Sequence, residues 1–414
     1  MSLPSGTSSI ADQDAVSQPS HRDGAALACR QDQRLPSSFQ VIDVRHEFYL
    51  CARSCPPGQG VQKVGMVTPW LNAFPRTVKP ILDEIDEILG VSLTRTLAEG
   101  PNAALNATEN SQPAIMATSI LILRVLENEF GFKTEERVDY TLGHSLGEFA
   151  ALVAGGYMEF QDALAMTRQR GEAMASASKE AVKKSGGEVG MVALVCENEQ
   201  RLQTLTEAIN EFIQLSTPGS KYDSVEDVPP VQQVTIANVN SKNQIVLSGS
   251  IERINTLLTH LRQFGGHDPR HVRLNSDSPF HSPLMKPAQQ FMEQFLNTPS
   301  ARTGRDVITF PGRMPCISNV SARPFESKQD LKDLLARQCT ETVRWWESVR
   351  YLDQELKVRR WIGIGPGKVG RNLVGKEVGM KGQVKGGGVW GITTPQEAEA
   401  TIKGLDETEY AEEE

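Results

Sequence analysis

The sequence of 414 residues contains only six cysteines, and they do not form the closely spaced pairs of a metal site. The two nearest, Cys51 and Cys55, are separated by three residues, and no further candidate zinc ligands accompany them. We therefore expect free thiols in a reducing compartment, and no metal or cofactor. The six are Cys29, Cys51, Cys55, Cys196, Cys316 and Cys339.

Long hydrophobic runs and a surplus of positive charge are also missing. The longest apolar runs, such as residues 120–123, are far shorter than the roughly 20 residues that span a bilayer. A net charge of −8 opposes the broad electropositive surface that nucleic-acid backbones require. We therefore expect a soluble protein that binds neither membranes nor nucleic acid.

The two ends of the chain have little regular pattern. Residues 1–45 are rich in Ser, Gln, Asp and Pro, so we expect them to lack packed structure. Acidic residues interrupt this segment, which is unlike a mitochondrial transit peptide, and no apolar segment suggests secretion. At the other end, we expect residues 401–414 to form an acidic, solvated tail.

Between these ends, 39% hydrophobic and 23% charged residues are typical of a globular enzyme. The pattern predicts a large α/β domain in two parts, residues 46–185 and 275–400. Its first part contains helical spacing over 64–89, a helix that begins at Gln112-Pro113 and ends before Gly131, and a strand over 138–142. Its second part contains helices over 284–296 and 328–338 and strands near 316–319 and 361–364.

Residues 186–274 are expected to form a small domain inserted into the large one. Strands are predicted over 191–195, 234–239, 244–247 and 271–274, and helices over 200–215 and 251–264. The order strand, helix, strand, strand, helix, strand is the βαββαβ pattern of ferredoxin-like domains. The expected fold class is therefore an α/β-hydrolase-like domain with a parallel sheet plus a ferredoxin-like domain.

A candidate nucleophile lies directly after the strand over 138–142. Residues 143–147 read GHSLG, and an Ala-rich helix follows. GxSxG between a strand and a helix is the pattern of a nucleophile elbow, in which small neighbours let the serine hydroxyl project from a sharp turn. The helix N-terminus favours a developing negative charge at the same point. This context predicts that Ser145 is a nucleophile.

Three further residues are candidates for the same chemistry. His281 follows the small domain and is a better base than His144, whose side chain the elbow should turn away from Ser145. Arg170 lies on the helix region after the serine, and Gln59 lies in a Gly-rich loop that permits close backbone approach. On spacing alone, His281 could equally be a solvated loop residue and Arg170 a surface charge paired with a carboxylate.

Five motifs in a fixed order resemble the malonyl-CoA:acyl-carrier-protein transacylases of fatty-acid synthesis. They extend over about residues 56–380. The motifs are the Gln59 loop, GHSLGE at 143–148, Arg170-Gly171, SPFHS at 278–282 and GPGKV at 365–369. The polar loop at 216–230 and the single-chain length resemble the stand-alone fungal mitochondrial type. The resemblance thus implies a mitochondrial location. The N-terminal composition does not support this location, and a cytoplasmic one is the alternative.

The resemblance implies a role for each motif. Ser145 would be the nucleophile, His281 its base and Arg170 the clamp for the malonyl carboxylate. Gln59 and the backbone N–H of Leu146 would form the oxyanion hole.

Two further positions follow from the same resemblance. The chain around Gln338 would supply the carbonyl that orients the histidine, and the Asn238 region would line the pocket from the small domain. The family's apolar first strand is expected just before the Gln59 loop, but residues 48–56 contain a charge and an additional proline.

The resemblance implies ping-pong transfer of malonyl from coenzyme A to an acyl carrier protein through an ester on Ser145, by a monomer. A serine esterase or thioesterase is the alternative, although no HGGG-type loop precedes the serine. A catalytically silent module that binds carrier proteins is a third reading. Because carrier proteins are acidic, association would require a local basic patch. Candidates by position are Lys183, Lys184, Arg270, Arg273 and Lys286.

Overall fold

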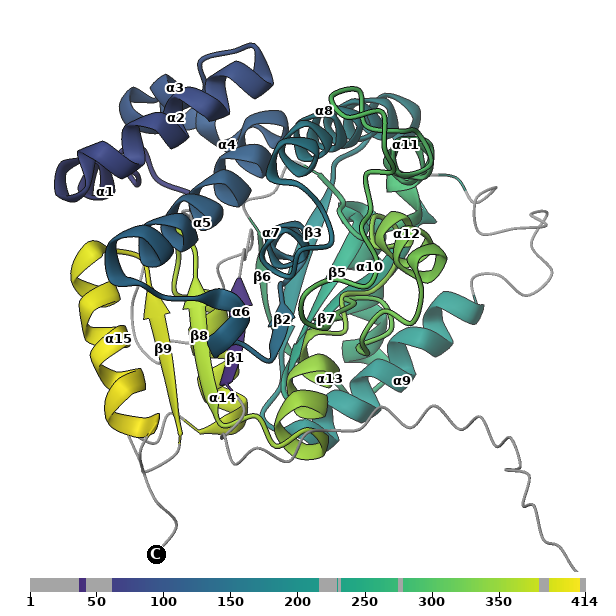
Figure 1. The fold of residues 1–414 in the computed structure, drawn as a ribbon. Coiled ribbons are helices and arrows are strands. Elements are labelled where there is room, and N and C mark those ends of the chain that lie inside the picture. Colours follow the sequence, from purple (N-terminus) through teal and green to yellow (C-terminus); the bar gives the residue numbers. More distant parts are fainter. Residues whose placement is uncertain are drawn as a thin grey trace, which may run out of the picture. The chain divides into compact units, whose positions relative to one another are not determined.

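Two β-sheets organise the chain in the computed structural model (Figure 1). The structure describes residues 37–41, 62–215, 229, 232–274, 278–379 and 387–409. One sheet is parallel and carries the nucleophile elbow, and the other is antiparallel and is built from the middle of the chain. Both belong to one compact unit, Leu35–Glu414.

The parallel sheet has five strands in the order β7-β2-β1-β8-β9. Each neighbouring pair is parallel, with Phe39 of the central strand paired to Thr141 on one side and Ile362 on the other. Helices cover a parallel sheet on both faces because the crossover connections run there. The strands are β1 (Ser37–Val41), β2 (Tyr140–Leu142), β7 (Cys316–Ile317), β8 (Arg360–Ile364) and β9 (Gly388–Ile392).

Strand β1 corrects the expectation that residues 1–45 lack packed structure. Ser37–Val41 occupies the middle of the parallel sheet, and the rest of residues 1–45 lies outside the described residues. The strand reads SSFQV, so its composition carries little hydrophobic signal. Pairing with strands distant in sequence, rather than its own pattern, defines it. Residues 48–56, where a first strand was expected, also lie outside the described residues.

Helices surround this sheet, and the two longest, α5 and α8, pack against each other. Helix α5 begins at Thr108, before the predicted Gln112-Pro113, and ends at Gly131 with φ 62°, as expected for a left-handed cap. The helices are α1 (Thr68–Ala73), α2 (Pro75–Leu89), α3 (Leu93–Glu99), α4 (Asn102–Asn106), α5 (Thr108–Phe130), α6 (Thr134–Arg137), α7 (Gly147–Ala154), α8 (Phe160–Ser185), the 3-10 helix η3 (Pro283–Met285), α11 (Lys286–Leu296), α12 (Lys328–Arg337), α13 (Trp345–Arg350), the π-helix η4 (Tyr351–Glu355), α14 (Val369–Val378) and α15 (Pro395–Glu409).

Helix α15 corrects the expectation of a solvated tail over residues 401–414. It continues to Glu409 and packs beside β9, with Leu405 only 2% exposed and Arg137 ion-paired to Asp406 (Figure 1). The acidic residues occupy its outer side, which concealed the buried side from a compositional reading. Residues 410–414 lie outside the described residues.

The antiparallel sheet has the order β4-β5-β3-β6, and α9 and α10 pack together beside it. Its element order and antiparallel pairing match the predicted βαββαβ pattern, and the two sheets together confirm the α/β class. The elements are β3 (Val189–Val195), α9 (Glu199–Leu215), β4 (Val234–Ser241), β5 (Gln244–Ser250), α10 (Ile251–Gln263) and β6 (Arg270–Arg273).

The two faces of this small sheet pack against different partners. Along β3, Val192 and Leu194 point into an apolar cluster with the helices, whereas Met191 and Ala193 belong to the large core. At the β4 edge, the N–H of Val239 donates to Val343 O (3.0 Å), and the N–H of Val343 donates to Ala237 O (2.8 Å). The small sheet is therefore hydrogen-bonded to the chain that follows α12.

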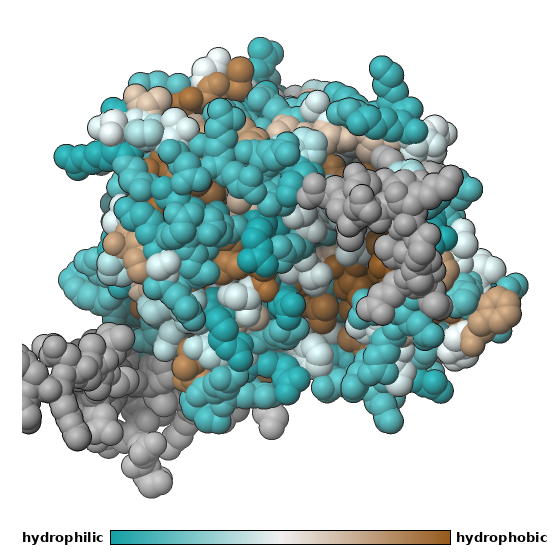
Figure 2. All heavy atoms as spheres, turned by 90° about the vertical axis from the view of Figure 1, so that its right-hand side faces the viewer, coloured by the Kyte–Doolittle hydropathy of each residue, from teal (hydrophilic) through white to brown (hydrophobic). Residues whose placement is uncertain are grey.

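The surface of the described residues is mainly hydrophilic. Large hydrophobic side chains exposed there are Val91, Val182, Phe264 and Val272. In Figure 2 hydrophilic residues cover most of the face shown, and hydrophobic ones are visible mainly between them. Across the described ranges, no helix has the length and apolar character to cross a bilayer.

Candidate active site

Ser145 lies at the tip of a tight turn between β2 and α7. Its φ of 53° is in the left-handed region, which is uncommon for a residue with a side chain and is typical of functional sites. Gly143 permits the turn, because a Cβ there would lie 2.0 Å from the backbone carbonyl of Gly147. Leu146 is the N-cap residue of α7, so the positive end of the helix lies beside the serine. The local sequence thus builds the predicted nucleophile elbow.

His281 contacts the serine directly. Its Nε2 is 2.7 Å from Ser145 Oγ, and its Nδ1 is 2.7 Å from the backbone carbonyl oxygen of Gln338. A carbonyl oxygen only accepts, so Nδ1 carries the proton and Nε2 is free to accept the serine proton. Both residues are buried, and His281 also has a positive φ of 55°. This arrangement is competent for general-base activation of a serine.

Asn319, directly after β7, holds the backbone on both sides of the elbow. Its Oδ1 accepts from the Ser145 N–H (2.6 Å), and its Nδ2 donates to Gly143 O (2.6 Å). Its own N–H donates to Glu148 Oε1 (3.0 Å). A turn with positive φ persists only where surrounding contacts determine it, and Asn319 supplies such contacts.

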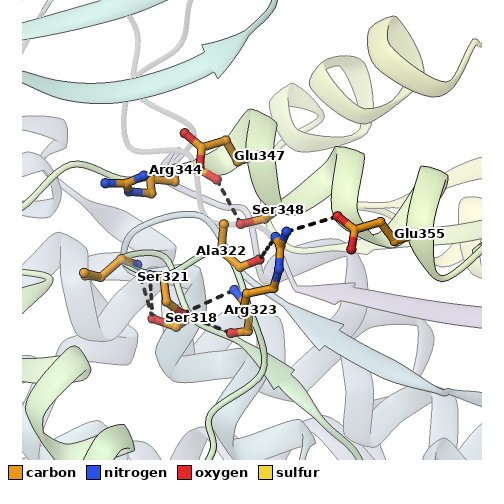
Figure 3. A network of polar contacts seen from close by, with 9 residues as sticks. Ser318, Ser321, Ala322, Arg323, Arg344, Glu347, Ser348 and Glu355 are labelled. Atoms are coloured by element: carbon orange, nitrogen blue, oxygen red, sulfur yellow. Dashed lines mark hydrogen bonds and ion pairs between the residues drawn. The ribbon is translucent and has the colours of Figure 1, made fainter.

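The loop that carries Asn319 is itself fixed by a polar network (Figure 3). The N–H of Ser318 donates to Arg323 O (2.9 Å), and that of Ala322 donates to Ser318 O (3.0 Å), which closes the loop. The guanidinium of Arg323 pairs with Glu355 (3.0 Å) and lies over the Tyr351 ring at 4.2 Å. These contacts tie the loop to the segment after α13 and limit the positions that Asn319 can adopt.

Arg170 is a buried cation held by amide groups. Its Nη1 donates to Gln112 Oε1 (2.6 Å) and its Nη2 to Gln338 Oε1 (2.8 Å), and its guanidinium lies 5.1 Å from the centre of the Phe149 ring. Within the described residues Arg170 forms no salt bridge and is 2% exposed. The surface-charge alternative from the sequence is therefore wrong, and the guanidinium can receive a carboxylate.

Gln338 joins these parts through three atoms. Its Nε2 donates to Ser145 O (2.7 Å) and to Glu148 Oε2 (2.7 Å), and its Oε1 accepts from Arg170. Its backbone oxygen accepts from His281. A single residue thus contacts the nucleophile, the base and the cation, so the three lie in one site.

His144 points away from the catalytic pair, as the elbow pattern predicts. Its Nε2 donates to Asn240 Oδ1 (2.9 Å) on β4, and its ring lies 5.2 Å from that of Trp345. Burial lowers the pKa of His144 to about 4, although the Asn240 contact acts in the opposite direction. His144 is therefore neutral at physiological pH and links the elbow to the small sheet.

Comparisons with known proteins identify the family. Residues 55–210 match the family model described as acyl transferase domain. The malonyl CoA-acyl carrier protein transacylase of Bacillus subtilis (strain 168) is 36% identical over 320 residues, which are 77% of this chain and 88% of that protein. The chain belongs to the malonyl CoA-acyl carrier protein transacylase family.

Solved structures of this family have the same fold. The acyl-carrier-protein S-malonyltransferase from Bartonella henselae matches with a TM-score of 0.68 and 30% identity, over 90% of this chain and 99% of that one. A type II PKS acyl-carrier protein in complex with its malonyl-transacylase matches with a TM-score of 0.68 and 27% identity, over 89% and 99%. Parallel and antiparallel sheets are thus arranged in this chain as in the transacylases.

The structure brings most of the predicted transacylase residues together. Ser145, His281, Arg170 and Gln338 form one connected group, and Leu146 adjoins it. Asn238 is 1% exposed on β4, and no hydrogen-bond partner of its side-chain amide occurs within the described residues. Gln59 lies outside the described residues.

Sequence reasoning assigned no role to three members of the site. Asn319 and Gln112 carry no local signal, because their contacts join segments far apart in the chain. Glu148 stands inside the GHSLGE motif and could have been singled out, because an acidic residue on an otherwise Ala-rich, buried helix needs partners.

Proposed function

We propose that this chain transfers malonyl from malonyl-CoA to the phosphopantetheine thiol of an acyl carrier protein, through a malonyl ester on Ser145. The observation that carries the proposal is the buried Arg170. Its guanidinium donates to the amide oxygens of Gln112 and Gln338, forms no salt bridge within the described residues and shares Gln338 with the Ser145–His281 pair. An activated serine beside a buried cation without a salt-bridge partner in the described structure fits an acyl group that ends in a carboxylate.

In the first half-reaction, Ser145 Oγ attacks the thioester carbonyl carbon while its proton passes to His281 Nε2. The resulting oxyanion is stabilised by backbone N–H groups at the start of α7, with Leu146 N–H and Gln59 as the proposed donors. When the carbon–sulfur bond breaks, His281 returns the proton to the departing thiolate, so that coenzyme A leaves as a thiol. The acyl group then remains as an ester on Ser145.

In the second half-reaction, the carrier-protein thiol takes the place of coenzyme A. Its proton passes to His281 Nε2 as the sulfur attacks the ester carbon, and the proton reaches Ser145 Oγ when the carbon–oxygen bond breaks. The Nδ1 contact to Gln338 O holds the imidazole in the tautomer that both steps require. The enzyme returns to its starting state without a cofactor.

The carrier protein is proposed as the partner on the family relation, and the solved complex shows such a partner for a related malonyl-transacylase. The basic residues expected to attract the carrier protein differ in whether their charges are already paired with acidic residues. Lys184 pairs with Glu180 (2.7 Å) and Arg273 with Glu188 (2.6 Å), so both charges are partly compensated. No ion pair of Lys183 or Arg270 occurs within the described residues, and Arg270 is exposed on β6. These two are the better candidates.

Intact-mass measurement of the purified chain tests the proposed function. Mixing with malonyl-CoA should add one malonyl group to the wild type and none to Ser145→Ala. The adduct should persist in buffer and disappear when holo acyl carrier protein is added. Rapid loss to water alone would identify a hydrolase, and no adduct on the wild type would indicate a non-catalytic carrier-binding module.

We further propose that the chain is the stand-alone mitochondrial type of fungi and acts as a monomer. The polar sequence at 216–230 supports this placement, whereas the acidic residues in 1–45 oppose it. Microscopy of a C-terminally tagged chain against a mitochondrial marker tests the location, and diffuse cytoplasmic signal would contradict it. Light scattering of the purified protein tests the oligomeric state.

A further inference from the structure

Glu148 is a buried carboxylate at the centre of the site that the proposed chemistry does not use. It lies in the first turn of α7, three residues after the nucleophile, and is 1% exposed. Its Oε1 accepts from the backbone N–H of Asn319 (3.0 Å), and its Oε2 accepts from Gln338 Nε2 (2.7 Å). The two donors come from segments that follow β7 and α12, so the carboxylate joins distant parts of the chain.

Both groups held by Glu148 contact the catalytic residues. Asn319 bonds the Ser145 N–H and the Gly143 carbonyl, which fixes the elbow from one side. Gln338 bonds the Ser145 carbonyl and Arg170 through its side chain, and His281 through its backbone. Nucleophile, base and cation are therefore each contacted by a residue that Glu148 binds.

We propose that Glu148 is a positioning residue for acyl transfer, whose two carboxyl oxygens set the direction of the Gln338 amide and the place of the Asn319 loop. It thereby aligns Ser145, His281 and Arg170 together. This inference rests on the proposed function for its substrate, but not for its geometry.

The hydrogen-bond pattern around Gln338 shows why an acceptor is required at this position. With its present orientation, the Gln338 NH₂ group faces two acceptors, Ser145 O and Glu148 Oε2, and its oxygen faces the Arg170 guanidinium. If the amide turned over, its NH₂ group would face the guanidinium and its oxygen would face the Ser145 carbonyl. Both contacts would then be unfavourable. By accepting from the Gln338 NH₂ group, Glu148 favours the amide orientation in which the Gln338 oxygen faces the Arg170 guanidinium.

A purely structural role does not account for this carboxylate. Burial raises the pKa of Glu148 to about 8, although the Asn319 and Gln338 donors and the charge of Arg170 act in the opposite direction. Burying an ionisable group costs free energy that an apolar residue would not. A residue kept only for stability would therefore be expected to be apolar here, whereas one that must accept two hydrogen bonds cannot be.

The test compares Glu148→Gln with Asp162→Asn in the full chain. The glutamine keeps the size of Glu148, but whichever way its amide turns, an N–H group faces a donor on Asn319 or Gln338. Asp162 is the matched control, because it is a second buried carboxylate, accepts from Ser300 Oγ (2.8 Å) and lies at the start of α8 outside the catalytic contacts. Thermal unfolding of each variant records the stability loss.

Two readouts separate positioning from stability. The first is kcat and KM with malonyl-CoA and acetyl-CoA, and the second is the rate of labelling by phenylmethanesulfonyl fluoride, followed by mass. In the labelling, the serine oxygen bonds to sulfur, fluoride leaves and the hydroxyl proton passes to His281, so no malonyl group is needed. We expect Glu148→Gln to lower kcat/KM for malonyl by about 10- to 100-fold, to lower the malonyl/acetyl ratio and to slow labelling.

Asp162→Asn should keep the wild-type ratio and labelling rate even if it unfolds at lower temperature. Wild-type values for Glu148→Gln, or losses in both variants that simply follow their unfolding temperatures, would overturn the proposal. If Glu148→Gln does not fold, Glu148→Asp, whose shorter carboxylate cannot reach both donors, must show the lower ratio and slower labelling. A wild type labelled by the sulfonyl fluoride but not by malonyl-CoA would overturn the proposed substrate, while the labelling comparison still decides the role of Glu148.

Discussion

Two buried regions of this molecule are held together in opposite ways. The small core consists of apolar side chains between the antiparallel sheet and helices α9 and α10, among them Leu194, Leu247 and Leu257. The elbow network consists of Ser145, His281, Asn319, Gln338, Glu148 and Arg170, which are polar and directionally bonded. Apolar packing is non-directional and tolerates small shifts, whereas each bond of the network fixes an angle.

The difference between the two regions indicates which contacts keep the backbone of the active site in its strained conformation. Ser145 and His281 both have positive φ, and conformations of this kind cost of the order of 1–3 kcal/mol each. The small core contributes stability without constraining the catalytic atoms, and the network constrains them. Changes in the network should therefore alter catalysis, and changes in the small core should alter stability.

The largest effect is expected where the backbone itself cannot adapt. In Gly143→Ala the new Cβ would lie 2.0 Å from the Gly147 carbonyl, so the elbow must open. Acyl-enzyme formation should fall by at least about 10³-fold, because the nucleophile and the oxyanion donors lose their alignment. Single-turnover mass measurement with malonyl-CoA gives the rate.

Gly187→Ala is the control for this change, because a Cβ at Gly187 meets no atom within 4 Å. That variant should react as fast as the wild type. If Gly143→Ala also reacted normally, the close approach at the elbow would not matter for catalysis.

The small core should respond in stability alone. Leu257→Ala removes a fully buried side chain from α10, and such truncations cost about 2–5 kcal/mol of unfolding free energy. Urea unfolding should show the loss, while the malonyl/acetyl ratio of the folded enzyme stays unchanged. Thr259→Ala, which removes an exposed side chain from the same helix, should change neither quantity. A shifted ratio in Leu257→Ala would mean that the two regions are coupled.

The sequence carried enough information for the elbow, the small domain and the identity of the candidate base. GHSLG between strand and helix is a local pattern, and the apolar run of β3 and the helical spacing of apolar residues along α10 are equally local. His281 was a candidate from its position in the sequence, the carbonyl near Gln338 was implied by the family resemblance, and the structure places the two in contact. Such features depend on neighbours in sequence or on a recognised motif.

Other features could not be predicted, because they depend on pairing across the chain. Strand β1 has few apolar residues and is defined by β2 and β8, while the buried side of α15 was hidden by its acidic outer side. Asn319 meets Ser145 from 174 positions away, and no local spacing marks such a contact. The same holds for Gln112, whose oxygen holds Arg170.

Within the network, Arg170 should determine which acyl group is chosen. Charge-assisted hydrogen bonds contribute about 1.5–3 kcal/mol, so Arg170→Ala should lower kcat/KM for malonyl-CoA by roughly 10- to 150-fold. Acetyl-CoA, which lacks the carboxylate, should gain relative to malonyl-CoA in a competition assay.

Arg168→Ala is the control for this change. Arg168 lies on the same helix and pairs with Glu172 at the surface (2.6 Å), so its removal should leave the acyl preference unchanged. An unchanged malonyl/acetyl ratio in Arg170→Ala would remove the basis for assigning malonyl.

The smallest effect concerns His144, which joins the two regions through Asn240. Its pKa is lowered from 6.5 to about 4 in the folded chain, so the unfolded chain binds a proton first as the pH falls. The resulting stability is fully present above pH 6.5 and is lost towards pH 4. Between pH 7 and 5.5 the loss amounts to about 1 kcal/mol.

Glu148, with its raised pKa, makes the unfolding free energy change with pH in the opposite direction below pH 8, so the His144 effect must be measured as a difference between variants. We therefore expect the unfolding free energy, measured by urea unfolding, to change between pH 7 and 5.5 by about 1 kcal/mol more in favour of the folded state in His144→Gln than in the wild type. Equal pH dependence in the wild type and His144→Gln would show that the elbow histidine does not resist protonation.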